Sequence, residues 1–287
     1  MAPETFDLRA ITFRFVAREP IKFDGCGSGN WLRGAFGGAL REIACSPDCP
    51  GRAGLPIAAC PNSAVCTYAR VFEPRSVKGP SGLSDPPRPF VFRLAHLANR
   101  SLVCGDEFSV QMNFFDTSRE DFDEFARAFS RLARAELIGA SSTLCSLTLG
   151  TAPERPDGIS IQFLSPTDLK SSSNPNSNVD FSTVFARARD RVSTLRALYG
   201  KGPLGIDFRV LGERARVIRT ARLDLHRVRQ QRRSARTGLT HNIGGFIGTA
   251  EYEGPVAEFL PILRAARWTG VGRHCVWGNG EIVTVTK

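Results

Sequence analysis

The chain has 287 residues, of which 42% are hydrophobic and 23% charged, a composition typical of globular proteins and unlike that of disordered ones. Its length favours two domains of ordinary size. No segment has the run of about eighteen apolar residues that a membrane span requires, and the first residues lack the apolar run of a signal peptide. We therefore expect a cytoplasmic protein with no membrane partner.

The first half of the chain predicts the element order β-α-β-β-α-β. Alternating apolar residues predict strands, and apolar residues at helical spacing predict helices. Asn30 is the expected N-cap of the first helix, and Thr117 to Glu120 have the pattern of a capping box for the second. The expected strands cover 11–15, 90–94, 110–114 and about 144–149, and the expected helices cover 31–44 and 122–132.

An insertion rich in glycine, proline and cysteine interrupts this half at about 45–89. It holds four cysteines within 22 residues, Cys45, Cys49, Cys60 and Cys66. Four thiolates brought together by turns can hold a metal in a closed tetrahedral site, so we expect a structural zinc here. The spacing is looser than in paired Cys-x2-Cys motifs, which leaves an iron–sulfur cluster and plain reduced thiols as alternatives.

The second half repeats the same order. Its expected strands cover 159–163, 217–228, 245–252 and 282–285, and its expected helices run from Asp180 to Gly200 and over 255–267, the latter kinked or delayed by Pro261. The fold class is therefore α+β, with two tandem ferredoxin-like (βαββαβ) domains. The expected boundaries are 1–151 for the domain with the insertion and 152–287 for the second domain, which contains a basic segment and a C-terminal glycine-rich loop.

The positive charge is concentrated in one segment. The net charge is +10, and residues 209–236 alone carry ten arginines against Glu213 and Asp224. A local excess of this size attracts polyanions, and guanidinium groups suit phosphates and base edges. A solvated basic face is the alternative. The RNA-binding candidates in this segment are Arg227, Arg229, Arg232, Arg233 and Arg236.

A glycine-rich loop lies between the last expected helix and strand. Gly270, Gly272, Gly278 and Gly280 are four glycines in eleven residues. Glycine lets the backbone approach a ligand closely, and bare N–H groups beside Arg273 predict a phosphate cradle. A purely structural turn is the alternative. The loop lacks the motif of a nucleotide P-loop, which argues against a nucleotide triphosphatase.

A glycine-rich loop at this point of tandem ferredoxin-like domains resembles the RAMP superfamily, and specifically the CRISPR-associated endoribonucleases that cut precursor CRISPR RNA within its repeats. In the second half the resemblance rests on residues 245–248, 259–263 and 271–280. In the first half it rests on residues 32–41, the four-cysteine segment and residues 68–74. The similarity covers about residues 13–285.

The resemblance implies metal-independent cleavage with no catalytic cofactor. The ribose 2′-hydroxyl attacks the adjacent phosphate and leaves a 2′,3′-cyclic phosphate, which calls for a base, a proton donor and a cation. His274, in the glycine loop, and His241, beside the arginine segment, are the imidazole candidates among four histidines. His226, in the basic strand, is expected to be structural or phosphate-contacting, and His96 is expected to lie at the end of a strand of the first domain. The implied partners are CRISPR repeat RNA, as precursor and as retained product, and other Cas proteins.

The sequence departs from the family pattern in one respect. Family enzymes often carry a catalytic histidine on or just after the first helix, and residues 35–41 contain none. Tyr68, Arg33 and Arg41 then become candidates to position or stabilise a phosphate, unless the two arginines only solvate the helix. A non-catalytic RAMP subunit that binds guide RNA in an effector complex is the alternative function. A metal-dependent regulator that binds duplex DNA is a more distant one.

Overall fold

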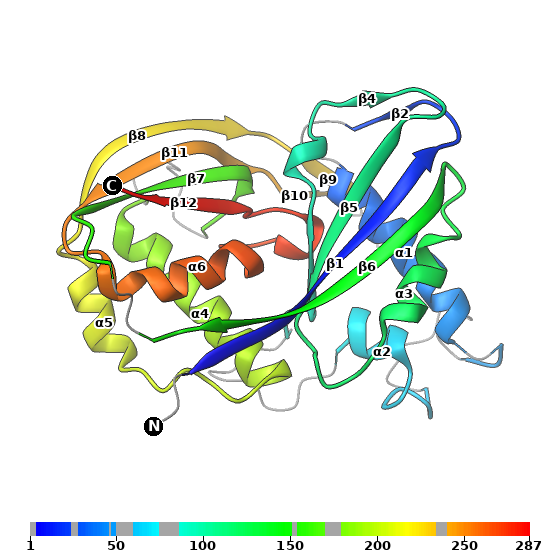
Figure 1. Ribbon diagram of the computed structural model, residues 1–287, viewed down its shortest axis with the longest axis horizontal. Coiled ribbons are helices and arrows are strands. Elements are labelled where there is room, and N and C mark those ends of the chain that lie inside the picture. The colour runs from blue at the N-terminus through cyan, green and yellow to red at the C-terminus, as the bar shows by residue number, and fades with distance from the viewer. Residues whose placement is uncertain are drawn as a thin grey trace. The chain divides into compact units, whose positions relative to one another are not determined.

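The computed structural model describes residues 4–23, 28–45, 47–49, 60–74, 86–150, 154–169, 179–233 and 240–287. This part of the chain forms two compact units. The N-terminal unit contains Leu8–Cys145, and the C-terminal unit contains the residues from Ser146 onward together with those through Asp7. Each unit combines helices with a four-stranded sheet (Figure 1), so the protein belongs to the mixed α and β class, as expected.

The sheet of the N-terminal unit has the strand order β3-β5-β1-β6, and β5 pairs antiparallel with both neighbours. Ile11, Phe13 and Phe15 are buried, as the alternation predicted. The last strand begins at Ala135, well before the expected start. The pattern did not predict this earlier part, because its side chains are largely exposed and its apolar alternation is weak. The strands are β1 (Thr5–Ala17), β3 (Phe90–Arg93), β5 (Glu107–Phe114) and β6 (Ala135–Thr148), and β2 (Ile21–Lys22) pairs separately with β4 (Ser101–Leu102).

Aromatic packing joins the helices of this unit to its sheet. Phe36 of α1 stacks on Phe129 of α3 with 4.7 Å between ring centroids, and it meets Phe92 of β3 edge-on at 6.0 Å. Such pairs add to the free energy gained by burying the rings. The helices are α1 (Ser28–Ala44), α2 (Thr67–Phe72) and α3 (Phe122–Phe129), with a short 3₁₀ turn, η4 (Ala95–Leu97).

Both N-terminal caps predicted for this unit were wrong, although α3 begins at Phe122 as expected. Asn30 lies inside α1, whose buried face already begins at Gly29, so packing outweighs the capping preference of asparagine. The expected capping box at Thr117 to Glu120 lies outside α3. Asp116 accepts hydrogen bonds from the backbone N–H and the hydroxyl of Ser118, and this local turn competes with helix formation.

The C-terminal unit has a sheet of the same topology, with the order β12-β7-β11-β8. Its central strand β7 pairs antiparallel with β11 and β12, and β11 pairs antiparallel with the edge strand β8. The strands are β7 (Gly158–Thr167), β8 (Arg219–Val228), β11 (Gly245–Glu253) and β12 (Ile282–Thr286), and β9 (Gln231–Arg233) forms a hairpin with β10 (Thr240–Asn242).

Helices α4 and α6 lie on the same side of this sheet (Figure 1). The helix predicted to start at Asp180 is α4, and Asp180 caps it by accepting from the backbone N–H of Thr183 at 2.8 Å. Pro261 sits in the first turn of α6, where its missing N–H leaves no hydrogen bond unmade, so the helix starts late and does not kink there. The helices are α4 (Phe181–Tyr199), α5 (Phe208–Ala215) and α6 (Leu260–Thr269), with the 3₁₀ turns η6 (Ala257–Phe259) and η7 (Cys275–Trp277).

The order strand, helix, strand, strand, helix, strand therefore occurs twice, with α2 and α5 as additions. In each sheet the first and third strands of this order occupy the centre. None of the helices in the described part of the chain combines the length and the apolar character that a membrane crossing would need.

Candidate functional site

The glycine-rich loop joins α6 to β12 in a backbone conformation that requires glycine. Gly270, Gly272, Gly278 and Gly280 all have positive φ, between 71° and 85°. A Cβ atom on Gly272 would lie 2.3 Å from the carbonyl oxygen of Asp168, and one on Gly280 would lie 2.1 Å from that of Val271. The glycines therefore allow backbone to pack against backbone, and they fix the course of the loop.

The N–H groups of this loop mostly bond to the protein itself. The Arg273 N–H donates to the Asp168 carbonyl at 2.8 Å, and the Gly280 N–H donates to the Pro166 carbonyl at 3.0 Å. We expected bare N–H groups in this loop that could cradle a phosphate. The expectation is wrong for six of the loop N–H groups, because backbone carbonyls already accept hydrogen bonds from them. These six belong to Gly270, Val271, Arg273, Trp277, Gly278 and Gly280.

The loop presents His274 in a constrained pose. His274 is one of two residues other than glycine with positive φ in the described chain, at 65°, and it precedes η7. Its imidazole stacks on the indole of Trp277, with 4.9 Å between ring centroids and 23° between ring planes. A strained, partly buried imidazole held by stacking is typical of functional positions. The sequence analysis did not single out Trp277, although its spacing of three residues from His274 is the spacing that lets two side chains meet across one turn.

Arg273 extends from the same loop toward solvent. Its side chain is 55% exposed, and its guanidinium lies 3.4 Å from the carboxylate of Asp168. An exposed pair of this kind contributes little to stability, so the guanidinium can exchange its partner for a phosphate at little cost. Asp168, at the end of β7, thus fixes Arg273 through both backbone and side chain.

The arginine segment is only partly available for a polyanion. Arg214 pairs with Glu258 at 3.0 Å, Arg216 pairs with Glu213 at 2.7 Å, and Arg219 pairs with Glu253. Exposed Arg227 and Arg229, at the end of β8, have no acidic group of the described residues within 4.0 Å. The uncompensated positive charge therefore gathers at this end of the edge strand.

This end of β8 adjoins the glycine loop through a chain of hydrogen bonds. The buried Asn279 side chain donates from Nδ2 to the Ile243 carbonyl at 2.7 Å, and the Ile243 N–H donates to the Gln230 carbonyl at 2.9 Å. Gln230 follows Arg229 directly. The loop and the basic end of the strand therefore meet within one unit, and Asn279, which the sequence analysis also missed, connects them.

The β9–β10 hairpin continues from this point, and backbone pairing places His241 opposite Arg232. The side chains of His241, Arg232 and Arg233 lie outside the described part of the structure, as does the whole of Arg236. His226, on β8, is exposed and lies 3.6 Å from Asp224. His96 is exposed on η4, not on a strand, and its Nε2 lies 3.0 Å from the carbonyl of Ser109.

The remaining candidates, Tyr68 and Arg33, belong to the N-terminal unit. Tyr68 of α2 stacks on Phe72 with 5.3 Å between centroids, and the Arg33 guanidinium lies 5.3 Å from the centre of the same ring. Burial and the charge of Glu73 raise the pKa of Tyr68, although nearby arginines oppose the shift. Tyr68 is therefore protonated at neutral pH and can donate a hydrogen bond, but it cannot act as a base.

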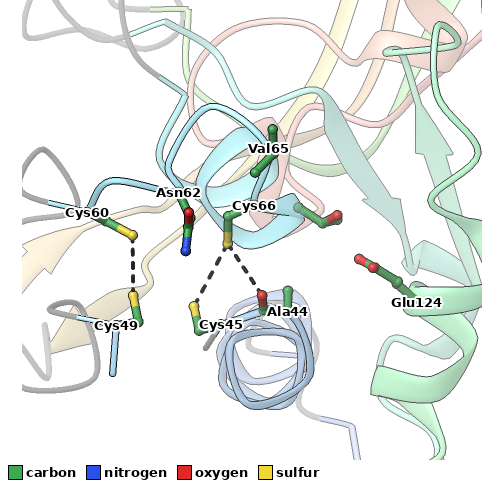
Figure 2. A pocket seen from close by; sticks show the side chains of 9 residues that line it. Ala44, Cys45, Cys49, Cys60, Asn62, Val65, Cys66 and Glu124 are labelled. Atoms are coloured by element: carbon green, nitrogen blue, oxygen red, sulfur yellow. Dashed lines mark hydrogen bonds between the residues drawn. The ribbon is translucent and has the colours of Figure 1, made fainter. Parts of the chain in front are cut away.

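The four cysteines predicted as metal ligands lie together in the same unit. They line a pocket of about 240 Å³ between the end of α1 and the start of α2 (Figure 2). The Sγ atoms of Cys45 and Cys66 are 3.9 Å apart, and those of Cys49 and Cys60 are 3.7 Å apart. As they stand, no three His, Cys, Asp or Glu side chains of the described residues surround one point closely enough to hold a metal ion.

Two family profiles together match almost the whole chain. The profile described as the AF_1859_N N-terminal domain matches residues 6–153, slightly more than half of the sequence. The profile described as CRISPR-associated endoribonuclease Cas6 matches residues 161–282, which include β8, the hairpin and the glycine loop. No curated protein sequence matches the chain.

Solved structures share the fold over nearly the full length. Thermus thermophilus Cas6 (TTHB231) is 16% identical, with 98% of this chain and 99% of that chain covered and a TM-score of 0.58. A product complex of Cas6 (TTHA0078) is 17% identical, with coverage of 98% and 100% and a TM-score of 0.55. A chain of the partial Cas6-RT-Cas1–Cas2 complex is 12% identical and has a TM-score of 0.59, with all of this chain and 47% of that chain covered.

Proposed function

We propose that the chain is a Cas6-type CRISPR-associated endoribonuclease, because its residues 161–282 match the Cas6 profile, and that it binds CRISPR repeat RNA and cuts precursor CRISPR RNA within the repeats. One observation carries the proposal: the residues matched by the endoribonuclease profile are those that bring the glycine loop and the free basic end of β8 together. The place of action would be the cytoplasm. The strand order of the two sheets supports a duplicated ferredoxin-like fold, with the first and third strands central in both.

The RNA would be held mainly by its backbone. A-form RNA exposes phosphates and 2′-hydroxyls and hides its major-groove base edges, so guanidinium groups at phosphate spacing are suitable contacts. Arg227 and Arg229 supply uncompensated charge, and Arg232, Arg233 and Arg236 would extend it along the hairpin. Because most loop N–H groups bond internally, the loop would contact RNA through Arg273 and His274.

The proposed reaction is transesterification without a metal. The 2′-oxygen attacks the adjacent phosphorus, the bond from phosphorus to the 5′-oxygen breaks, and the products are a 2′,3′-cyclic phosphate and a 5′-hydroxyl. A base removes the 2′-hydroxyl proton, an acid protonates the leaving oxygen, and a cation stabilises the charged phosphorane. We assign one proton transfer to His274 or His241 and the charge stabilisation to Arg273. Tyr68 and Arg33, of the N-terminal unit, are proposed separately as contacts to RNA phosphates.

The partners of the structural neighbours extend the proposal. Cas6 (TTHA0078) has been solved in a product complex and with a substrate mimic, and a Cas6-containing chain has been solved in a complex with Cas1 and Cas2. By analogy, this chain would retain its RNA product and associate with other Cas proteins.

The test is cleavage of labelled repeat RNA in EDTA. We expect one cut per repeat and a 3′ end that changes mobility after removal of a cyclic phosphate. An RNA with a single 2′-deoxyribose at the cut site removes the nucleophile and should be bound but not cut. Cleavage of the deoxy substrate would refute the mechanism, and binding of repeat RNA without any cleavage would instead identify a guide-binding RAMP subunit.

A further inference from the structure

The four-cysteine pocket is not used by the proposed reaction. Cys45 follows the last residue of α1, and Cys66 precedes the first residue of α2. Cys45, Cys49 and Cys60 are each 7% exposed and form one buried cluster, against which Cys66 packs. Figure 2 shows the two sulfur pairs at the same pocket, with the labelled carboxylate of Glu124 turned to another part of it. Side-chain packing alone does not explain why four cysteines gather at one small pocket.

The sulfur separations favour a single tetrahedral metal ion. Zinc–thiolate bonds are about 2.3 Å long, so two ligands on one tetrahedral ion have sulfurs about 3.8 Å apart. The observed separations of 3.9 Å and 3.7 Å are therefore each the length of one tetrahedral edge. A disulfide requires about 2.05 Å, which is far shorter. A cubane iron–sulfur cluster holds each cysteine on a different iron and would separate the sulfurs further.

We propose that Cys45, Cys49, Cys60 and Cys66 bind one structural Zn²⁺ ion. Each pair has the spacing of two ligands on one ion, both pairs line the same pocket, and binding would turn them toward a common centre in it. Each thiol would release its proton to solvent on binding, which gives a site with a net charge of −2. Arg41 of α1, one turn before Cys45, supplies positive charge nearby.

The consequence of such a site is a fixed angle between α1 and α2. Helix α2 carries Arg70, whose guanidinium bonds to both carboxylate oxygens of Asp121, at 2.6 Å and 2.8 Å, just before α3. A metal at the other end of α2 would complete the anchoring of this six-residue helix, which is too short to be stable on its own. The ion would thereby hold Tyr68 and Arg33 in place without touching RNA.

The test is the metal content of the full chain purified without chelators or RNA. We expect about one zinc per chain and no iron, and tetrahedral thiolate bands in the visible spectrum after exchange with Co²⁺. Cys49→Ser and Cys66→Ser, one from each pair, should lose the metal, whereas Cys104→Ser and Cys145→Ser should keep it. Cys60→His should keep zinc but shift the Co²⁺ spectrum, because a nitrogen replaces a sulfur ligand.

Several results would overturn the proposal. They are wild-type protein without stoichiometric zinc, iron in place of zinc, oxidised cysteine pairs, or a Cys49→Ser variant that keeps its metal. If the serine variants do not fold, titration of the wild-type protein with a thiol-blocking mercurial still decides, since zinc should be released as four thiols react. The measurement needs no RNA, so its failure is distinguishable from failure of the proposed cleavage.

Discussion

The imidazole of His274 stacks on the indole of Trp277, with 4.9 Å between ring centroids. The left-handed backbone at His274 and the 3₁₀ turn that follows it make this contact possible. The loop in turn keeps its shape through bonds to the end of β7, at Asp168 and Pro166. The imidazole is therefore positioned by the fold before any RNA binds, which is the preorganisation that proton transfer requires.

His274→Ala should slow cleavage far more than it weakens binding. A positioned general acid or base contributes about 10²–10⁴ in rate, whereas one imidazole among many phosphate contacts adds little affinity. Single-turnover cleavage and equilibrium binding of repeat RNA measure the two effects. His96→Ala, an exposed histidine on η4, is the control and should change neither. Unchanged cleavage in His274→Ala would move the role to His241, for which the same substitution is the test.

Replacing Arg227 and Arg229 together with alanine should weaken RNA binding about tenfold or more and flatten its salt dependence. Each lost phosphate contact should reduce the slope of log affinity against log salt by about 0.7–0.9. Filter binding over a range of salt concentrations gives the slope. Arg216→Ala is the matched control, because Arg216 is equally exposed but already paired with Glu213. A slope identical to that of the wild type would place both arginines outside the interface.

Gly272→Ala should destabilise the protein more than Gly202→Ala. Both glycines have positive φ, at 85° and 95°, so both substitutions carry the backbone penalty of about 1–2 kcal/mol. Only at Gly272 would the new Cβ also meet a carbonyl oxygen, at 2.3 Å, while the space at Gly202 is open. Urea denaturation should show an additional loss of at least about 1 kcal/mol for Gly272→Ala. Equal losses would contradict the close packing of the loop against Asp168.

Asp180 should make the stability depend on pH. Burial raises the pKa of its carboxyl, but hydrogen bonds from Ser182 and Thr183 outweigh burial and hold the pKa below its ordinary value. The folded state therefore binds this proton less readily than the unfolded state, so the stabilisation is complete above about pH 5 and is lost as pH falls through the folded-state value.

Asp180→Asn keeps an N-cap acceptor but cannot ionise, so it isolates this effect. The wild type should be more stable than the variant by about 0.3–1 kcal/mol at neutral pH, and the difference should vanish near pH 2. Asp180→Ala, which removes the cap, should cost about 1 kcal/mol at neutral pH. Urea denaturation of all three proteins across this range is the measurement, and a difference that grows toward acid would show that the sign is wrong.

Local patterns in the sequence were sufficient for the two β-α-β-β-α-β repeats and their order, but not for the additional helices α2 and α5. Alternation at Ile11 to Phe15 and at Ile159 to Phe163 predicted strands, because a strand with one buried face repeats every two residues. The helix start at Asp180 also followed from the local pattern, and of the two outcomes left open at Pro261, a late start or a kink, the structure has the late start. The resemblance to the CRISPR endoribonucleases also rested on such short motifs taken in order.

Contacts between distant residues decided the rest. The glycines of the loop were recognisable, but six of the loop N–H groups turned out to be occupied: two of their acceptors lie at the end of β7, about a hundred residues earlier, and the others lie in α6 and the loop itself. Pairing with Glu213, Glu253 and Glu258 removed three arginines from the free basic surface. The grouping of Cys45 with Cys66 and of Cys49 with Cys60 likewise required folded coordinates. Secondary structure depends on neighbouring residues, so the sequence alone determined which segments of the two repeats become helices and strands. Which polar groups remain available to RNA or a metal depends on what the rest of the chain places beside them, so only the tertiary structure decided it.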